Sequence, residues 1–333
     1  MADEGQLYER AQRRVGTSLR RGKYTLDALL GLGAMGAVYA ATHRNGMRVA
    51  IKVLHPELAR VEELRSRFLR EGYIANMVHH PGLVRVLDDD IDDDGSTFLV
   101  MELLEGRTLS AEWVANGHVL PLVRVAEIVD ALLDVLDAIH AAGIVHRDVK
   151  PDNVFLVRGG PLKVLDLGVA RILIESRLTA SGQIVGTPEF MAPEQARGDV
   201  LAITGRADIY SVGAVMFSLL TGQAVHEGRS PMEAMIFGAT RPARSLTTAW
   251  PAAPPLLVHL VDTALAFEHE RRWSTVAEMR AALASALRLV PQVAPTRSSA
   301  PPAQGTSGTL LGSGPTNDRE VPVPRVRPGG RKG

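Results

Sequence analysis

The stretch GLGAMGAV, residues 31–38, carries three glycines at the spacing G-x-G-x-x-G. Glycines at this spacing let a backbone approach a phosphate closely, because no Cβ stands in the way. Three kinds of phosphate-binding loop share all or part of this pattern. They are the turn of a dinucleotide-binding fold, the P-loop, and a glycine-rich flap between two strands. The residues after the last glycine must distinguish them.

The chain after Gly36 has the character of a strand. Residues such as Val38 and Tyr39 favour a strand, and Asn45-Gly46 is a strong hairpin signal. A dinucleotide fold needs a helix directly after its third glycine. A P-loop needs Lys-Ser/Thr at positions 37 and 38, which hold Ala-Val here. The sequence therefore predicts a flap between two strands, followed by a strand, RVAIKVL, that carries Lys52.

The composition excludes several classes of function. Lys+Arg and Asp+Glu both number 37, so no overall basic field attracts nucleic acid. The absence of cysteine excludes disulfides, thiolate metal sites and cysteine nucleophiles. The N-terminus is polar and acidic, unlike a secretory signal, and no uncharged apolar run approaches the roughly 18 residues of a membrane span. We expect a cytoplasmic protein with no membrane segment and no nucleic-acid partner.

Changes in composition divide the 333 residues into three parts. Residues 1–22 are charged, have no sustained apolar period, and are predicted to form a flexible leader. The region 24–104 has the pattern of short strands with one helix, ELRSRFLREGYIANMV, and helices dominate after it. After Val290 the chain is rich in Pro, Ser and Gly, with six basic and two acidic residues. We predict a disordered basic tail over 288–333, because this composition cannot bury enough apolar surface to fold. The later helices are predicted over residues 126–142, 208–221, 256–267 and 275–288.

The acidic run DDDIDDDG, residues 88–95, resembles the start of an EF-hand calcium loop. Such a loop needs a bidentate glutamate at its twelfth position, which is Met101 when the count begins at Asp90. The flanking segments LVRVL and STFLVMEL are strand-like. An Asp-Gly turn between two strands therefore explains the run better than a metal site.

Further motifs follow the glycine flap in a fixed order: VAIK with Lys52, HRDVKPDN (146–153), DLG (166–168) and APE (192–194). With this set the chain resembles the protein kinase superfamily over about residues 23–287. GAMGAVY and GTPEFMAPEQARG are most similar to the bacterial, eukaryotic-like (Hanks-type) serine/threonine kinases. The resemblance implies an α+β, bilobal fold, with ATP in the cleft between the lobes. The N-lobe, about 23–105, would be small and β-rich with one helix, and the C-lobe, about 106–287, would be larger and α-helical.

The resemblance also assigns roles in the handling of phosphate. Lys52 would hold the α- and β-phosphates of ATP and pair with Glu71, which lies ten residues before Pro81 as the family pattern expects. The alternatives for that carboxylate are Glu57, Glu62 and Glu63. Asn153 and Asp166 would hold Mg²⁺ through hard oxygen ligands.

Asp148 would orient the substrate hydroxyl or accept its proton, and Lys150 would neutralise the γ-phosphate. A lysine at this place is typical of the serine/threonine branch of the family. The carbonyl of Glu102 and the backbone of Leu104 would hydrogen-bond adenine, with Met101 as gatekeeper. The full set of ATP-binding residues that the resemblance implies is Leu30, Gly31, Gly33, Gly36, Val38, Ala50, Lys52, Met101, Glu102, Leu104 and Phe155.

Regulation is expected at the activation segment, RILIESRLTASGQIVGTPEF. Phosphorylation of Thr179 or Ser181 would order it by pairing the phosphate with Arg147. Gly72, next to Glu71, is expected to loosen its helix, since glycine costs a helix about 1 kcal/mol relative to alanine. We therefore expect the Lys52–Glu71 pair to form only on activation. Met35 is expected at the tip of the flap, over the γ-phosphate.

Two interactions in the C-lobe are also implied by the resemblance. Asp208 would hydrogen-bond the backbone of the catalytic loop, and Arg272 would pair with Glu194. Leu167 stands where the family usually has phenylalanine, and its packing should survive because leucine is also bulky and apolar.

The predicted partners are ATP and proteins with Ser or Thr, with a dimer for trans-autophosphorylation. Two alternatives stay open. A pseudokinase would bind ATP without catalysis, which the presence of Lys52, Asp148, Asn153 and Asp166 argues against. A small-molecule kinase of the same fold would lack the substrate-docking segment that GTPEFMAPEQARG resembles.

Overall fold

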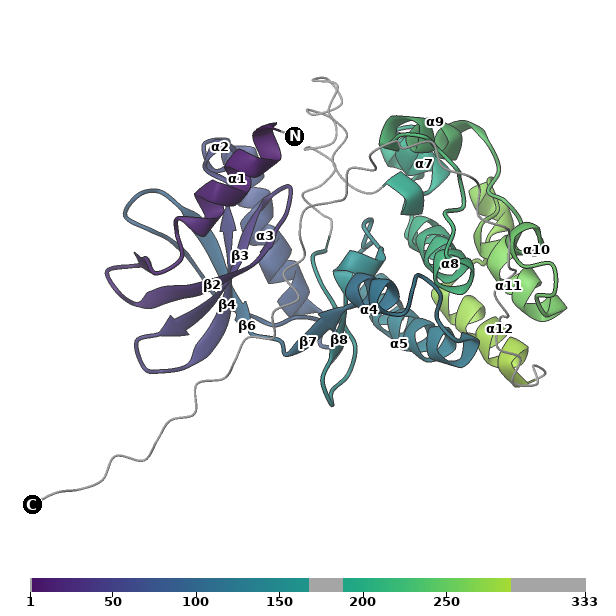
Figure 1. Ribbon diagram of the computed structural model, residues 1–333, viewed down its shortest axis with the longest axis horizontal. Helices are drawn as coiled ribbons and strands as arrows, with labels where there is room; N and C mark the ends of the chain where they lie inside the picture. Colours follow the sequence, from purple (N-terminus) through teal and green to yellow (C-terminus); the bar gives the residue numbers. More distant parts are fainter. Residues whose placement is uncertain (1, 168–187, 289–333) are drawn as a thin grey trace, which may run out of the picture. The chain divides into compact units, whose positions relative to one another are not determined.

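The computed structural model describes residues 2–167 and 188–288 (Figure 1). The first part is built on a six-stranded antiparallel sheet, in the order β1-β2-β3-β4-β6-β5. Two helices that follow β4 accompany the sheet, α2 (Pro56–Ala59) and α3 (Glu62–Met77), and α3 matches the helix expected in this region. The strands are β1 (Ser18–Leu19), β2 (Tyr24–Leu32), β3 (Gly36–His43), β4 (Arg48–Leu54), β5 (Val86–Ile91) and β6 (Thr97–Glu102).

The predicted strand–turn–strand is confirmed. The glycine loop joins β2 to β3, and β3 turns into β4 through Asn45-Gly46, where Gly46 has a φ of +88°. Strand β4 has the bounds of the predicted strand RVAIKVL. Its side chains alternate between two faces of the sheet. Val53 joins a core cluster that includes Ala11, whereas Leu54 packs with Phe68 of α3, so Lys52, two residues before Leu54, lies on the face of α3.

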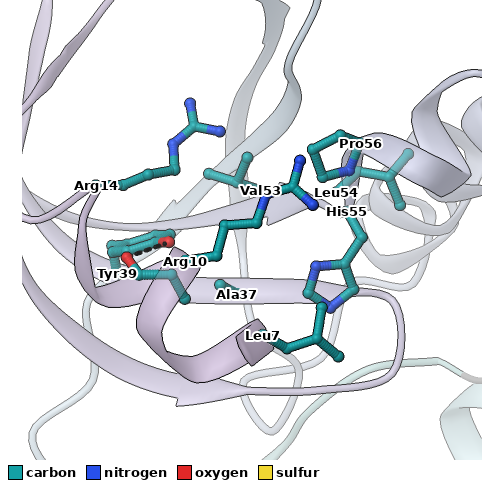
Figure 2. Close-up of a pocket in the computed structure, with 10 residues that line it drawn as sticks. Leu7, Arg10, Arg14, Ala37, Tyr39, Val53, Leu54, His55 and Pro56 are labelled. Carbon is teal, nitrogen blue, oxygen red and sulfur yellow. Dashed lines mark hydrogen bonds between the residues drawn. The ribbon is translucent and has the colours of Figure 1, made fainter. Parts of the chain in front are cut away.

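The N-terminal segment differs from the flexible leader expected over residues 1–22. Helix α1 (Ala2–Gln12) packs on the face of the sheet opposite α3 (Figure 1), and β1 extends the sheet at its edge. Ala11 is buried, and its carbonyl accepts a hydrogen bond of 3.0 Å from the hydroxyl of Tyr39 (Figure 2). The apolar positions Leu7, Ala11 and Val15 recur every four residues, a pattern too sparse to predict a helix among so many charges.

The acidic run forms the hairpin between β5 and β6, as predicted, with Gly95 at a φ of +84° in the turn. Its carboxylates face the basic residues of the N-terminal segment. Arg20 pairs with Asp90 at 2.8 Å, and Lys23 pairs with Asp88 at 2.9 Å. Arg14 and Arg21 make further ion pairs to this hairpin. The segment 14–23 therefore neutralises much of the charge of the hairpin.

The second part is mainly helical, with a small antiparallel sheet in the order β7-β8-β9. Nearly every residue of α8 is buried, as expected for a central core helix. No helix within residues 2–167 and 188–288 is long and apolar enough to span a membrane. The elements are β7 (Gly106–Thr108), α4 (Leu109–Ala115), α5 (Leu122–Ala141), β8 (Val154–Val157), β9 (Lys163–Val164), α7 (Pro193–Ala196), α8 (Gly205–Thr221), α9 (Pro231–Thr240), α10 (Leu246–Ala249), α11 (Pro255–Ala264) and α12 (Val276–Arg288).

The four helices predicted over residues 126–142, 208–221, 256–267 and 275–288 correspond to α5, α8, α11 and α12. Helix α9 was not predicted from the sequence, although its start carries a recognisable cap. Ser230 accepts from the N–H of Glu233 at 3.2 Å, and Pro231 occupies the first turn.

Candidate active site

A residue of α8 holds the backbone of the loop HRDVKPDN through two hydrogen bonds. The buried carboxylate of Asp208 accepts hydrogen bonds from the backbone N–H groups of His146 and Arg147, both at 2.8 Å. Arg147 has a φ of +68°, which costs a non-glycine residue of order 1 kcal/mol or more. The two bonds from Asp208 stabilise this conformation, and the expected role of Asp208 is confirmed.

Asp148 is fixed by its neighbours in the loop. Its backbone N–H donates to Nδ1 of His146 at 3.2 Å, and the side-chain amide of Asn153 donates to its carbonyl and to Oδ2 at 2.8 and 2.9 Å. Lys150 Nζ lies 3.3 Å from the same Oδ2. Burial lowers the pKa of His146, which favours the neutral ring that can accept at Nδ1. The structure thus brings three of the predicted residues, Asp148, Lys150 and Asn153, into one cluster.

Lys52 reaches Asp166, which lies far away in sequence. Nζ is 2.5 Å from Oδ1 of Asp166, and the lysine is buried while nearly half of the Asp166 side chain, 47%, is exposed. Burial alone would lower the pKa of Lys52, but the carboxylates of Asp166 and Glu71 raise it above its ordinary value. The part of Asp166 that is shielded from water would raise its pKa, but the cation of Lys52 outweighs this effect and lowers it. Both groups are therefore charged at neutral pH.

Glu71 does not make the expected ion pair. Among the described residues Lys52 pairs with Asp166, and Glu71 is buried with its Oε2 lacking any hydrogen-bond partner. Burial raises the pKa of Glu71 to about 8, although the nearby Lys52 acts in the opposite direction. The carboxyl group is therefore held protonated near neutral pH.

Gly72 has a packing role beyond its effect on the helix. A Cβ at this position would lie 3.0 and 3.2 Å from the two methyl groups of Leu99 on β6. Such contacts are tighter than side chains normally make, so glycine lets α3 approach the sheet closely. This close approach, which the sequence alone did not indicate, places Glu71 beside Lys52.

The glycine loop is anchored to the end of β4. A Cβ on Gly36 would lie 2.1 Å from the carbonyl oxygen of Val53, so only glycine fits there. Met35 packs against the cluster of Leu54, Phe68 and Leu99, so its side chain is partly buried and not simply exposed at the tip of the loop. His55 hydrogen-bonds the carbonyls of Gly33 and Met35, both at 2.9 Å. Gly31 and Gly33 are exposed.

The segment Met101–Leu104 contains the last two residues of β6 and is tied to β9 by a partly buried ion pair. Lys163 Nζ lies 2.6 Å from Oε1 of Glu102 and donates to the carbonyl of Leu83 at 2.9 Å. Sequence reasoning assigned only the carbonyl of Glu102 and missed its side chain and Lys163. A single lysine within the apolar strand LKVL was the available signal, since a buried lysine needs a partner.

The remaining predicted ATP-binding residues lie on strands of both sheets. Ala50 is buried on β4, opposite Met101 of β6. Leu30 on β2 is 49% exposed, and Phe155 on β8 is half-buried. Thr179 and Ser181, the predicted phosphorylation sites, lie outside the described residues.

Residues 24–285 match the family described as the protein kinase domain. The chain belongs to this family. The kinase assignment covers both the sheet with the glycine loop and the helical part that carries Asp148 and Asp166. Protein kinases use ATP and a divalent metal ion.

Bacterial serine/threonine-protein kinases are among the relatives of this kinase chain. Pkn1 of Myxococcus xanthus is 41% identical over 276 residues, which are 81% of this chain and 39% of that protein. The probable kinase PknB of Corynebacterium glutamicum is 36% identical over 271 residues, or 78% of this chain and 42% of that protein. The solved kinase domain of PknI from Mycobacterium tuberculosis is 28% identical with a TM-score of 0.63, covering 82% of this chain and 98% of that domain. The chain thus spans about two fifths of the length of these curated relatives.

The oxygen donors of this kinase site suit a hard divalent cation. Asn153 uses its amide nitrogen to hold Asp148, which turns the amide oxygen away from that contact. Asp166 is charged and partly exposed, and the backbone N–H of Leu165, the residue before it, donates to the carbonyl of Asn153 at 2.8 Å. One amide oxygen and one carboxylate are ligands that Mg²⁺ accepts together with phosphate oxygens and water.

The C-lobe of the kinase fold contains the predicted buried ion pair. Arg272 donates to both carboxylate oxygens of Glu194, each at 2.8 Å, and both residues are buried. The prediction of this pair is confirmed.

Leu167 is buried in the core of the helical part, against which Ile74 of α3 also packs. Leucine therefore keeps the packing expected at this position.

Proposed function

We propose that this chain is a protein-serine/threonine kinase, which transfers the γ-phosphate of ATP to Ser or Thr of proteins and uses Mg²⁺. The observation that carries the proposal is the arrangement around Asp148 and Asp166. One carboxylate is held by an amide and a lysine within the HRDVKPDN loop, and the other contacts Lys52 from β4. Phosphoryl transfer depends on positioning and charge neutralisation, and these groups supply both.

Each residue then has a separate task. Lys52 would bind the α- and β-phosphates, and Lys150 would neutralise charge on the transferred group. Asp148 would orient the substrate hydroxyl and accept its proton. Asn153 and Asp166 would hold Mg²⁺, which supplies positive charge to the phosphates when bound. The nucleotide would also be bound by the other residues expected from the sequence, which are Leu30, Gly31, Gly33, Gly36, Val38, Ala50, Met101, Glu102, Leu104 and Phe155.

Incubation of the chain with Mg·ATP, followed by mapping of phosphorylated residues, tests the proposal. We expect phosphate on Ser or Thr of the chain or of an added protein, and none with Asp148→Asn. Nucleotide binding without any phosphate transfer would instead support a pseudokinase. We also propose that the chain acts in the cytoplasm, because the activity depends on ATP.

We also propose that phosphorylation of Thr179 or Ser181 activates the chain through Arg147. Within the described residues, the Nε of Arg147 is buried without a hydrogen-bond partner. A buried guanidinium nitrogen in this condition is costly unless an anion reaches it, and a phosphate would satisfy it. Full activity of the Thr179→Ala/Ser181→Ala double variant would contradict this.

Autophosphorylation between two copies is part of the same proposal. The Asp148→Asn chain, which cannot phosphorylate itself, can serve as a substrate for the parent chain. Appearance of phosphate on the Asp148→Asn chain would support transfer in trans. Phosphate confined to the parent copy, at every ratio of the two chains, would indicate transfer within one molecule.

A further inference from the structure

Two hydrogen bonds join the tip of the glycine loop to His55, the residue after β4. The backbone N–H of His55 donates to the carbonyl of Met35 at 2.9 Å, and its imidazole Nε2 lies 2.9 Å from the carbonyl of Gly33. A carbonyl can only accept, so Nε2 carries the hydrogen and donates it. Any residue other than proline could make the backbone bond, but the side-chain bond depends on histidine.

The side-chain bond fixes the orientation of one peptide unit. In a trans peptide the carbonyl oxygen and the next N–H point in opposite directions. Because the carbonyl of Gly33 is directed at His55, the N–H of Ala34 is directed away from it. Glycine at position 33 has the backbone freedom to turn this peptide over, and the bond to His55 opposes that.

His55 lies on the face of the sheet that α1 covers. It lines a hollow of about 30 Å³, the size of one water molecule, together with Leu7 and Arg10 of α1 (Figure 2). Arg10 also forms an ion pair with Glu57, two residues after His55. Helix α1 therefore lies next to the segment that carries His55, and Arg10 ties the helix to Glu57 in that segment.

The opposite face of the sheet carries Lys52. Lys52 and Leu54 point to the side of α3, where Glu71 lies. An N–H of Ala34 that points away from His55 is thus on the side where the phosphates of ATP would meet Lys52. Helix α1 lies outside the region 24–285 that matches the kinase family.

We propose that His55 is a positioning residue for the glycine loop. Its imidazole holds the Gly33–Ala34 peptide with the N–H of Ala34 toward the phosphates, and α1 holds His55 in place. The inference rests on the proposed binding of ATP by this loop. A donor that is already oriented binds an anion with a smaller loss of conformational freedom, so the bond should raise nucleotide affinity.

Three variants test the role of His55. His55→Leu removes the donor, His55→Gln keeps an amide donor, and His79→Leu is a control at an exposed histidine of the same lobe. Two measurements apply to each: hydrogen–deuterium exchange of residues 30–37 without nucleotide, and the Kd of Mg·ADP by calorimetry. For His55→Leu we expect faster exchange and a Kd raised about fivefold, the effect of one hydrogen bond. For His55→Gln and His79→Leu we expect a Kd within about twofold of the parent.

A second pair of variants tests the role of α1. Ala11→Asp places a carboxylate where α1 contacts the sheet, because Ala11 is only 6% exposed. The control Gln12→Asp adds the same charge at the next, exposed position of α1. With His55 intact, we expect Ala11→Asp to speed exchange in residues 30–37 and to raise the Kd, and Gln12→Asp to change neither. Circular dichroism checks that both variants remain folded.

The outcomes separate the claims. Equal exchange and equal Kd in His55→Leu and the parent would overturn the role of His55. A loss in His55→Gln as large as in His55→Leu would also overturn it, since ring packing would then explain the effect. Unchanged behaviour of Ala11→Asp would overturn the support by α1. If the parent chain fails to bind Mg·ADP, the proposed function fails, but exchange without nucleotide still decides whether His55 holds the loop.

Discussion

Lys52 Nζ lies 2.5 Å from Asp166 Oδ1, and this contact leaves Glu71 buried beside the lysine without an ion pair to it. A carboxyl group in that situation should be protonated, and burial raises the pKa of Glu71 to about 8. Protonation of Glu71 is thus a measurable property of this arrangement. An ion pair between Glu71 and Lys52 would lower the pKa again.

The first prediction concerns the pH dependence of stability. Between the ordinary value of 4.5 and about 8, folded Glu71 keeps a proton that the unfolded chain has released. The free energy of unfolding should therefore fall as pH rises through this window, by up to ~1.4 kcal/mol per pH unit. Glu71→Gln should show a flatter dependence in urea unfolding at pH 5 to 8. Glu63→Gln, exposed on the same helix, is the control, and equal slopes in all three proteins would contradict the prediction.

The second prediction concerns Gly72 and the packing of α3. Gly72→Ala gains helix propensity of about 1 kcal/mol, but its methyl group would meet Leu99 at 3.0 Å, and overpacking costs about 1–3 kcal/mol. We expect a net loss of stability in denaturant unfolding. Gly5→Ala in α1 meets no atom within 4 Å and should be neutral or stabilising. A gain of about 1 kcal/mol in Gly72→Ala would favour the simpler view that this glycine only loosens the helix.

The third prediction separates two glycines of the loop. Gly36→Ala would place a Cβ 2.1 Å from the carbonyl oxygen of Val53, whereas a Cβ at Gly31 meets nothing within 4 Å. We expect Gly36→Ala to lower the melting temperature and to disturb β3 and β4. Gly31→Ala should keep the parent melting temperature and change only nucleotide affinity. Thermal unfolding and calorimetry with Mg·ADP check both, and equal melting temperatures for the two variants would be inconsistent with this geometry.

The fourth prediction concerns the buried pair of Arg272 and Glu194. Arg272→Ala leaves a buried carboxylate without its partner, which should cost roughly 3–5 kcal/mol of unfolding free energy. The control is Arg124→Ala, which breaks an exposed pair with Glu127 and should cost less than about 1 kcal/mol. Chemical denaturation measures both. Similar losses in the two variants would show that burial of the first pair has little effect.

Periodic and local features of the chain could be predicted from the sequence. Strand β4 was predicted residue for residue, because its pattern alternates between two apolar faces. The Asp-Gly turn and the Asn45-Gly46 turn were predicted because each dipeptide favours one local conformation. The cluster of Asp148, Lys150 and Asn153 needed only the short HRDVKPDN motif, since all three lie within one loop.

Features that depend on distant contacts could not be predicted in the same way. Helix α1 has little apolar surface of its own, and it is stabilised by Tyr39 and by the sheet. The side chain of Glu102 forms an ion pair with Lys163, which lies 61 residues later in the sequence. Whether Lys52 forms its ion pair with Asp166 or with Glu71 depends on distances between residues that no local sequence pattern contains.

The N-terminal segment sets a practical limit on how the folded unit can be shortened. A chain cut at residue 24, where the family match begins, would keep every predicted catalytic residue. It would also uncover the apolar face formed around Tyr39 and Val53. The acidic hairpin would lose Arg14, Arg20 and Arg21 as counter-charges. Such a fragment would aggregate or fold poorly during purification, and an inactive sample would then reflect a misplaced boundary instead of defective catalysis.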